Sequence, residues 1–116
     1  MNDNSGLPAN EERRGERRVP VAADIEWASA GDLIAGRLGD LSSNGCFVLT
    51  AGEFADGEIV RLFFPMTDGS KLEILAEIRN FVQDIGFAAR FISISESQRE
   101  FIRSFAELHQ MADTES

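Results

Sequence analysis

The sequence is poor in the residues that carry most catalytic and metal chemistry. It contains one cysteine, one histidine and no tyrosine among 116 residues. A lone Cys46 excludes an internal disulfide and is compatible with a reducing compartment. It lies in an apolar run, so we expect a core residue and not a nucleophile. Neither a metal site nor a positioned catalytic base is visible, so we expect no enzymatic activity, no bound metal and no cofactor.

Long hydrophobic runs are also missing. No apolar run approaches the roughly 20 residues that a membrane-spanning helix needs. Residues 1–10 are polar and lack the apolar core of a signal peptide. We therefore expect no membrane insertion, and the cytoplasm is the expected location.

Positive charge is scarce overall but is concentrated in one place. Eleven Lys and Arg face 20 Asp and Glu, which gives a net charge of -9. This balance disfavours DNA or RNA as a partner, because a nucleic acid backbone requires a basic face. Four arginines nevertheless fall within residues 13–18, where Glu16 is the one acid. Such a cluster suits a small, highly charged anion that is held locally.

Alternation of apolar and polar residues predicts a β-rich fold. Val21, Ala23, Ile25 and Trp27 share one face of a first strand, and similar patterns recur along the chain. The strands expected from these patterns are 21–28, 33–38, 46–50, 59–64, 71–79 and 85–91. Turn residues separate them, including those of 67–70 and 83–84. Six short strands with close turns are typical of a small antiparallel barrel.

The end of the sequence has helical periodicity. Ser95 and Gln98 have the spacing of a capping box. Phe101, Ile102, Phe105 and Leu108 then recur at helical spacing, which predicts an amphipathic helix across the sheet or one barrel opening. We thus expect one domain over residues 13–111, with a ligand-clasping segment at 13–20, a barrel at 21–92 and a helix at 95–111. A flexible arm at 1–12 and a tail at 112–116 are expected to flank it.

Two polar stretches carry the chemistry. Arg14 and Arg18 flank Gly15, and guanidinium groups bind both phosphate and the O6 and N7 edge of guanine. In the second stretch, Asp40 can accept hydrogen bonds from guanine, and Ser42 can donate or accept them. Acceptors beside a group of cations favour a ligand with both donors and negative charge, such as a guanine nucleotide.

Simpler interpretations stand beside this one. An arginine cluster near a terminus is commonly a solvated arm. The stretch Asp40-x-Ser42-x-x-Gly45 is commonly a turn in which the side chain bonds its own backbone. Gly45 itself suits either a positive φ or a place where a side chain would block a ligand.

Together, Arg14-x-x-x-Arg18, an apolar strand and Asp40-x-Ser42-x-x-Gly45 resemble the PilZ domain. The resemblance implies a six-stranded barrel, dominated by β structure and completed by a C-terminal helix, that binds cyclic di-GMP, a bacterial second messenger. It implies that Arg14 and Arg18 contact phosphates and guanine edges. It also implies that Asp40 and Ser42 hydrogen-bond a guanine, while Gly45 shapes the turn.

The resemblance extends to further residues and to partners. Arg13 matches an extra arginine that adds to the phosphate clamp, and Arg79 is a candidate for stacking on a guanine; the role of Arg17 is open. Family members often bind the ligand as an intercalated pair. Ligand binding would pin a mobile Arg13–Arg18 segment, and an unidentified effector protein in motility, biofilm or exopolysaccharide regulation would read the change. The alternative is a PilZ-like protein-interaction module that binds no nucleotide.

Overall fold

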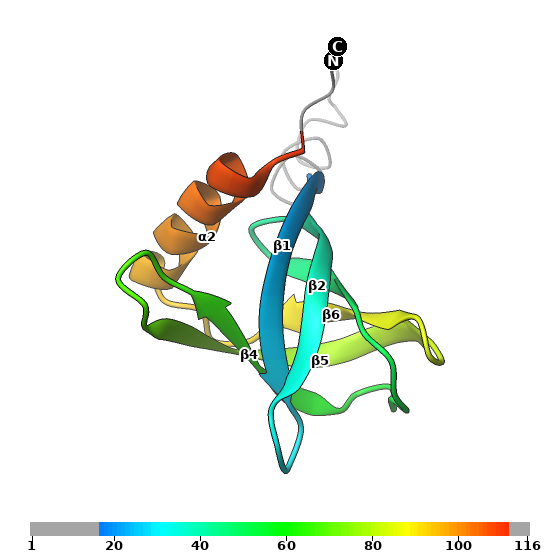
Figure 1. Cartoon of the computed structure of the whole chain (residues 1–116). Helices are drawn as coiled ribbons and strands as arrows, with labels where there is room; N and C mark the ends of the chain where they lie inside the picture. The colour runs from blue at the N-terminus through cyan, green and yellow to red at the C-terminus, as the bar shows by residue number, and fades with distance from the viewer. Residues whose placement is uncertain (1–16, 112–116) are drawn as a thin grey trace, which may run out of the picture.

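The computed structural model describes residues 17–111, which form a closed antiparallel barrel of six strands and one helix. Around the barrel the strands follow the order β1-β2-β3-β6-β5-β4, and helix α2 lies across one end (Figure 1). The elements are β1 (Val19–Ala28), β2 (Ile34–Leu41), β3 (Gly45–Leu49), β4 (Ile59–Pro65), β5 (Lys71–Val82), β6 (Gly86–Phe91) and α2 (Glu96–His109). The expected six-stranded barrel with a C-terminal helix is confirmed. The arm expected at 1–12 and the tail at 112–116 lie outside the described residues.

The alternating residues fill the barrel interior as the sequence predicts. The inward residues of β1 and β4 are buried, including Val21, Ile25, Val60 and Phe64. One end of the interior is closed by the packed rings of Trp27, Phe54 and Phe87, with centroids 5.0–5.9 Å apart. Phe54 comes from the loop between β3 and β4, which has no strand or helix periodicity.

Helix α2 closes the other end. The capping box is present: Ser95 Oγ accepts from the Gln98 amide at 3.1 Å, and the Gln98 side chain accepts from the Ser95 amide at 2.7 Å. Ile102 and Phe105 are buried, and Phe105 packs edge-on against Phe64 with centroids 5.3 Å apart. No helix in residues 17–111 is both long and apolar enough to span a membrane.

Leu108 does not take the core position that its spacing predicts. It is 69% exposed. The centre of the apolar face is occupied by Phe105 and His109, whose rings lie 4.2 Å apart, and Leu108 falls at the edge of that face. Beyond α2, the Met111 amide donates to the Pro20 carbonyl at 3.0 Å, so the end of the helix is tied to the beginning of β1.

Several strand boundaries differ from those expected: for example, β1 begins two residues earlier, at Val19, and β5 extends three residues further, to Val82. Two differences concern the turns. Strand β2 continues to Leu41, so Asp40 lies in a strand, and only residues 42–44 form the turn. The last strand is expected to begin at Ile85, but this residue lies in the β5–β6 turn and is 54% exposed. That turn closes with Asp84 at a positive φ of 65° and the Ile85 amide donating to the Val82 carbonyl at 3.0 Å.

Candidate ligand-binding site

The hydroxyl of Ser42 organises the turn between β2 and β3. Its Oγ accepts hydrogen bonds from the amides of Asn44 and Gly45, each at 3.2 Å. The same hydroxyl donates a hydrogen bond to the Gly45 carbonyl oxygen at 3.3 Å. The Ser42 amide also donates to that carbonyl at 2.8 Å. A hydroxyl has one donor and two acceptor lone pairs, so this one is fully used by the turn. The bond that the hydroxyl donates, at 3.3 Å, is long, whereas the two that it accepts, at 3.2 Å, lie at the upper end of the ordinary range.

Gly45 is required by the close approach of β6. A Cβ atom at this position would lie 2.2 Å from the Ala89 carbonyl oxygen. One of the two expectations for Gly45 was a positive φ. That expectation is wrong, because Gly45 is not among the positive-φ residues. The glycine lets β3 and β6 come together at the turn, opposite Arg90 in the register.

Arg18 and Asp40 form an ion pair across β1 and β2. The Nη1 atom of Arg18 lies 2.8 Å from Oδ1 of Asp40. Arg18 immediately precedes β1, and Asp40 is the register partner of Pro20, so strand pairing brings the two side chains together. The structure thus joins the arginine motif to the aspartate motif, although 22 positions separate them.

Irregular strand pairing surrounds this ion pair. The β2–β3 register shifts between Leu38 and Asp40, which makes Gly39 an extra residue on β2. The β5–β6 register shifts between Ile78 and Asn80, which makes Arg79 the extra residue on β5. Bulges re-aim side chains and are frequent next to functional sites. Here the bulge on β5 contains Arg79 itself, so the irregular pairing sets the direction of the Arg79 side chain.

These features meet at a cavity of about 250 Å³, which we call the barrel-side cavity. It brings together three arginines from separate parts of the chain with the β2–β3 turn. Its lining is Arg18, Ser42, Asn44, Gly45, Arg79, Ala88, Ala89 and Arg90. The predicted site residues Arg18, Ser42 and Gly45 therefore share one cavity with Arg79. Asp40 does not line the cavity, but it forms an ion pair with Arg18, which does. The sequence reasoning missed Arg90.

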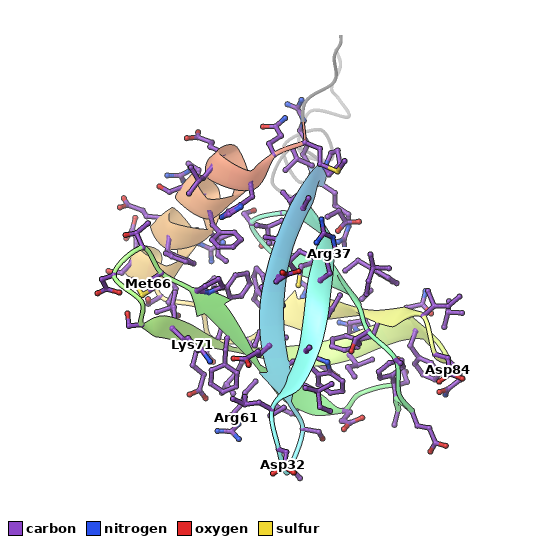
Figure 2. The ribbon with its side chains drawn as sticks, in the orientation of Figure 1. Asp32, Arg37, Arg61, Met66, Lys71 and Asp84 are labelled. Atoms are coloured by element: carbon purple, nitrogen blue, oxygen red, sulfur yellow. The ribbon has the colours of Figure 1, made fainter. Side chains whose placement is uncertain are left out.

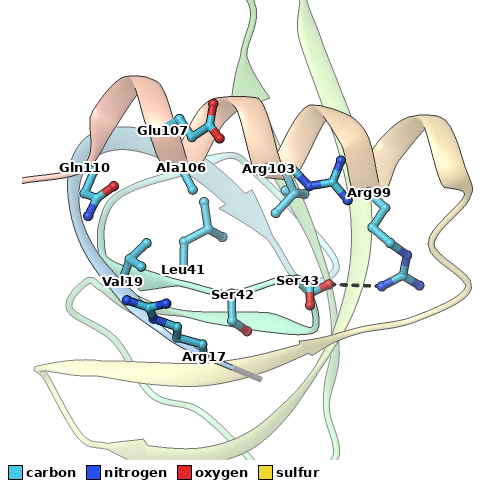
Figure 3. Close-up of a pocket in the computed structure, with 11 residues that line it drawn as sticks. Arg17, Val19, Leu41, Ser42, Ser43, Arg99, Arg103, Ala106, Glu107 and Gln110 are labelled. Carbon is cyan, nitrogen blue, oxygen red and sulfur yellow. Dashed lines mark hydrogen bonds between the residues drawn. The ribbon is translucent and has the colours of Figure 1, made fainter. Parts of the chain in front are cut away.

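A second cavity, the helix-side cavity, lies between α2 and the same turn (Figure 3). Its volume is about 190 Å³, and it shares Ser42 with the barrel-side cavity. Three other arginines line it together with apolar residues. The full lining is Arg17, Val19, Leu41, Ser42, Ser43, Arg99, Ile102, Arg103, Ala106, Glu107 and Gln110.

The positive charges of this acidic protein are gathered at the two cavities. Residues 17–111 contain nine lysines and arginines, of which three line the barrel-side cavity and three the helix-side cavity. The other three, Arg37, Arg61 and Lys71, are labelled in Figure 2 on the barrel wall. Arg37 and Lys71 form ion pairs with Asp24 and Glu26, and Arg61 lies over the ring of Phe63.

Other candidate residues are accounted for by packing. Cys46 is fully buried, and burial, followed by the nearby carboxylate of Asp40, raises the pKa of its thiol to about 12. The ring of His109 packs against that of Phe105 at an interplanar angle of 37°. Within residues 17–111 no three His, Cys, Asp or Glu side chains are grouped to hold a metal ion. Arg13 and Arg14 lie outside the described residues, so their predicted roles stay predictions.

The family model described as the PilZ domain matches residues 12–108, which is most of the chain. The chain belongs to the PilZ domain family. This confirms the family that the two motifs indicated. No match was found among curated protein sequences.

Solved structures with the same fold include other PilZ domains. The PilZ domain of CeSA from a cellulose-synthesizing bacterium is 22% identical, with a TM-score of 0.62 over 80% of this chain and 99% of that one. The PilZ domain of YcgR from Escherichia coli, solved with c-di-GMP, is 14% identical, with a TM-score of 0.68 over 80% and 88%. The Bacillus subtilis inhibitor of motility MotI/DgrA is 18% identical, with a TM-score of 0.61 over 78% of this chain and 47% of that one. Because the three sequences are only 14–22% identical to this one, the similarity shows a shared fold and nothing more.

Proposed function

We propose that this PilZ domain is a receptor for cyclic di-GMP, which binds in the barrel-side cavity. The observation that supports the proposal most directly is the meeting of Arg18, Arg79 and Arg90 beside Asp40 and Ser42. This arrangement offers cations for phosphates and acceptors for the N1–H and N2 amino group of guanine. The YcgR domain of the same fold was solved with this ligand.

Each residue has a role in the proposed complex. Arg14 and Arg18 contact phosphates and guanine edges, and Arg13 adds to the phosphate clamp. Asp40 and Ser42 bond a guanine, and Gly45 keeps the turn against β6. Arg79 stacks on a guanine face, which the planar guanidinium group favours. Arg90, opposite Gly45 in the register, is a further cation for the same ligand.

Binding acts as a switch in this proposal. In the free protein Arg18 is paired with Asp40. The ligand replaces that pair with its own contacts and orders the Arg13–Arg18 segment over the cavity, and a partner protein reads the new surface. The ordering cost is offset by several charge-assisted hydrogen bonds, each contributing about 1.5–3 kcal/mol. The ligand binds as one molecule or as an intercalated pair.

Calorimetric titration of the full chain with cyclic di-GMP tests this function. We expect binding to the parent, and no detectable binding to Arg14→Ala or Arg18→Ala. Loss of two charge-assisted hydrogen bonds, about 3 kcal/mol or more, lowers affinity by more than about 100-fold. Arg37→Ala is the matched control, because it removes the same charge and a more exposed ion pair, at 3.2 Å, elsewhere on the barrel. If Arg14→Ala or Arg18→Ala binds like the parent, the site is wrong.

A second function is a protein-interaction module that binds no nucleotide. The observation that favours it is the fold shared with the motility inhibitor MotI/DgrA, a protein named for its effect on motility. The two functions differ in one measurement. A parent protein that shows neither heat nor a thermal shift with cyclic di-GMP favours the interaction module.

A further inference from the structure

The helix-side cavity is separate from the barrel-side cavity but adjoins it at Ser42. Neither the arginine motif nor the turn motif contains the residues that α2 contributes to it. We propose that this cavity is a second nucleotide subsite, built by α2 through Arg99 and Arg103, which holds one half of a second cyclic di-GMP molecule. The inference rests on the proposed function.

Two consecutive arginines line different cavities. Arg17 lines the helix-side cavity and Arg18 lines the barrel-side cavity. Successive side chains of an extended segment point to opposite sides, so the residues just before β1 supply one guanidinium to each cavity. The turn at Ser42 lies between them. A ligand in each cavity would therefore be gripped by the same short segment.

The helix supplies the opposite wall. Arg99 and Arg103 are four residues apart and therefore lie on one face of α2. Figure 3 shows them on one side of the cavity and Arg17 on the other. The Nη1 atom of Arg99 lies 3.5 Å from the Ser43 carbonyl oxygen, a long hydrogen bond that places its guanidinium group beside the β2–β3 turn. The cavity thus has guanidinium groups on both sides of its opening.

Charge favours an anion here. No ion pair within residues 17–111 involves Arg17, Arg99 or Arg103. Glu107 contributes the one carboxylate to the lining, so three positive charges face one negative charge. Arg37 and Lys71, in contrast, have carboxylate partners. The helix-side arginines are therefore available to a phosphate.

The floor favours a nucleotide over a bare phosphate. Leu41 and Ile102 are buried beneath the cavity, and Val19 and Ala106 complete an apolar surface. A planar base can rest on such a surface while arginines at the rim bind its phosphate. At about 190 Å³ the cavity is smaller than the roughly 300 Å³ at which pockets for drug-sized ligands begin. It therefore fits one base with its phosphate, and the rest of the molecule lies outside it.

The test is the stoichiometry of cyclic di-GMP on the full chain, measured by calorimetry. We expect two molecules to bind each parent chain and one to bind each Arg103→Glu chain. The dissociation constant of that one molecule should be within about threefold of the first binding step of the parent. Arg103 is exposed, and circular dichroism and melting check that the variant is folded. Arg61→Glu is the matched control for charge reversal, because Arg61 lies on β4 (Figure 2) and lines neither cavity. We expect this variant to bind two molecules, like the parent.

A second variant tests the charge argument in the opposite direction. Glu107→Gln removes the one carboxylate of the lining, and we expect it to tighten the second binding step several-fold without affecting the first. The inference is overturned if the parent binds one molecule, if Arg103→Glu still binds two with parental affinities, or if Glu107→Gln leaves the second step unchanged. Those results leave the proposed function intact. A parent protein that binds no cyclic di-GMP overturns the proposed function, and this inference with it.

Discussion

The guanidinium of Arg18 lies 2.8 Å from the carboxylate of Asp40, and both residues are predicted ligand contacts. Each is therefore the partner of the other in the free protein. Their side chains are 46% and 33% exposed, so solvent screens the attraction. A ligand that binds Arg18 has to compete with Asp40, and it gains Asp40 as an acceptor when it succeeds.

A weak pair of this kind gives a prediction about the free protein. We expect Arg18→Ala and Asp40→Ala to change the free energy of unfolding little, with a coupling energy of about 0.2–1 kcal/mol. A double-mutant cycle followed by urea unfolding measures it, and the coupling decreases at high salt. A coupling above about 2 kcal/mol would mean that the pair holds the barrel together and is not poised for exchange.

Ser42→Ala behaves differently from Arg18→Ala. The Asn44 and Gly45 amides lose their acceptor, and Gly45 is buried. Leaving a buried donor unpaired costs about 1–3 kcal/mol, so we expect the free energy of unfolding to fall by that amount. Because Ser42 is a proposed contact of cyclic di-GMP, we expect binding of that ligand to weaken as well. Urea unfolding and calorimetry on the same variant separate the two effects, and unchanged stability would show that the turn does not depend on the hydroxyl.

Local patterns were sufficient to predict much of the fold. The inward residues of β1 alternate because one face is buried, and that period is visible in the sequence. The capping box at Ser95 was equally readable, since its partners are three residues apart. In β2 the pattern failed. Leu38 and Leu41 are both buried although they are three positions apart, because the bulge at Gly39 breaks the period.

The site depended on contacts that no local pattern encodes. Alternation places Arg90 outward, but its position beside Gly45 requires the pairing of β3 with β6, which are not consecutive in the chain. Arg79 reaches the same cavity through a bulge. The two helix arginines meet Arg17 only because α2 folds back across the barrel end. Sequence reasoning therefore named four residues that line the barrel-side cavity, and it did not name Arg90 or the two helix arginines. The four are Arg18, Ser42, Gly45 and Arg79.

Gly45→Ala tests the closeness of β3 and β6. The new methyl would lie 2.2 Å from the Ala89 carbonyl oxygen, which belongs to a paired strand and cannot move aside cheaply. We expect the free energy of unfolding to fall by about 1–3 kcal/mol or more. Gly39→Ala is the control, since its methyl would meet Leu49 at 3.6 Å, an ordinary contact. Equal unfolding midpoints for the two variants in urea would contradict the structure at this turn.

Cys46 gives the barrel a measurable response to alkaline pH. Burial raises the pKa of its thiol from an ordinary value of 9.0 to about 12. Between these values the unfolded chain has lost the proton while the folded chain keeps it, so folding becomes less favourable as pH rises. The loss is up to about 1.4 kcal/mol per pH unit, and it is absent below pH 9.

The sequence makes this effect easy to isolate, because it has no tyrosine, and Lys71 is its one lysine. We expect the free energy of unfolding of the parent, measured in urea, to fall between pH 9 and 11, while Cys46→Ala shows a much flatter profile from a lower starting stability. A thiol reagent should react with the parent only as it unfolds, since the side chain is fully buried. Parallel pH profiles for the two proteins, or rapid labelling of the folded parent, would place the thiol at the surface and not in the barrel interior.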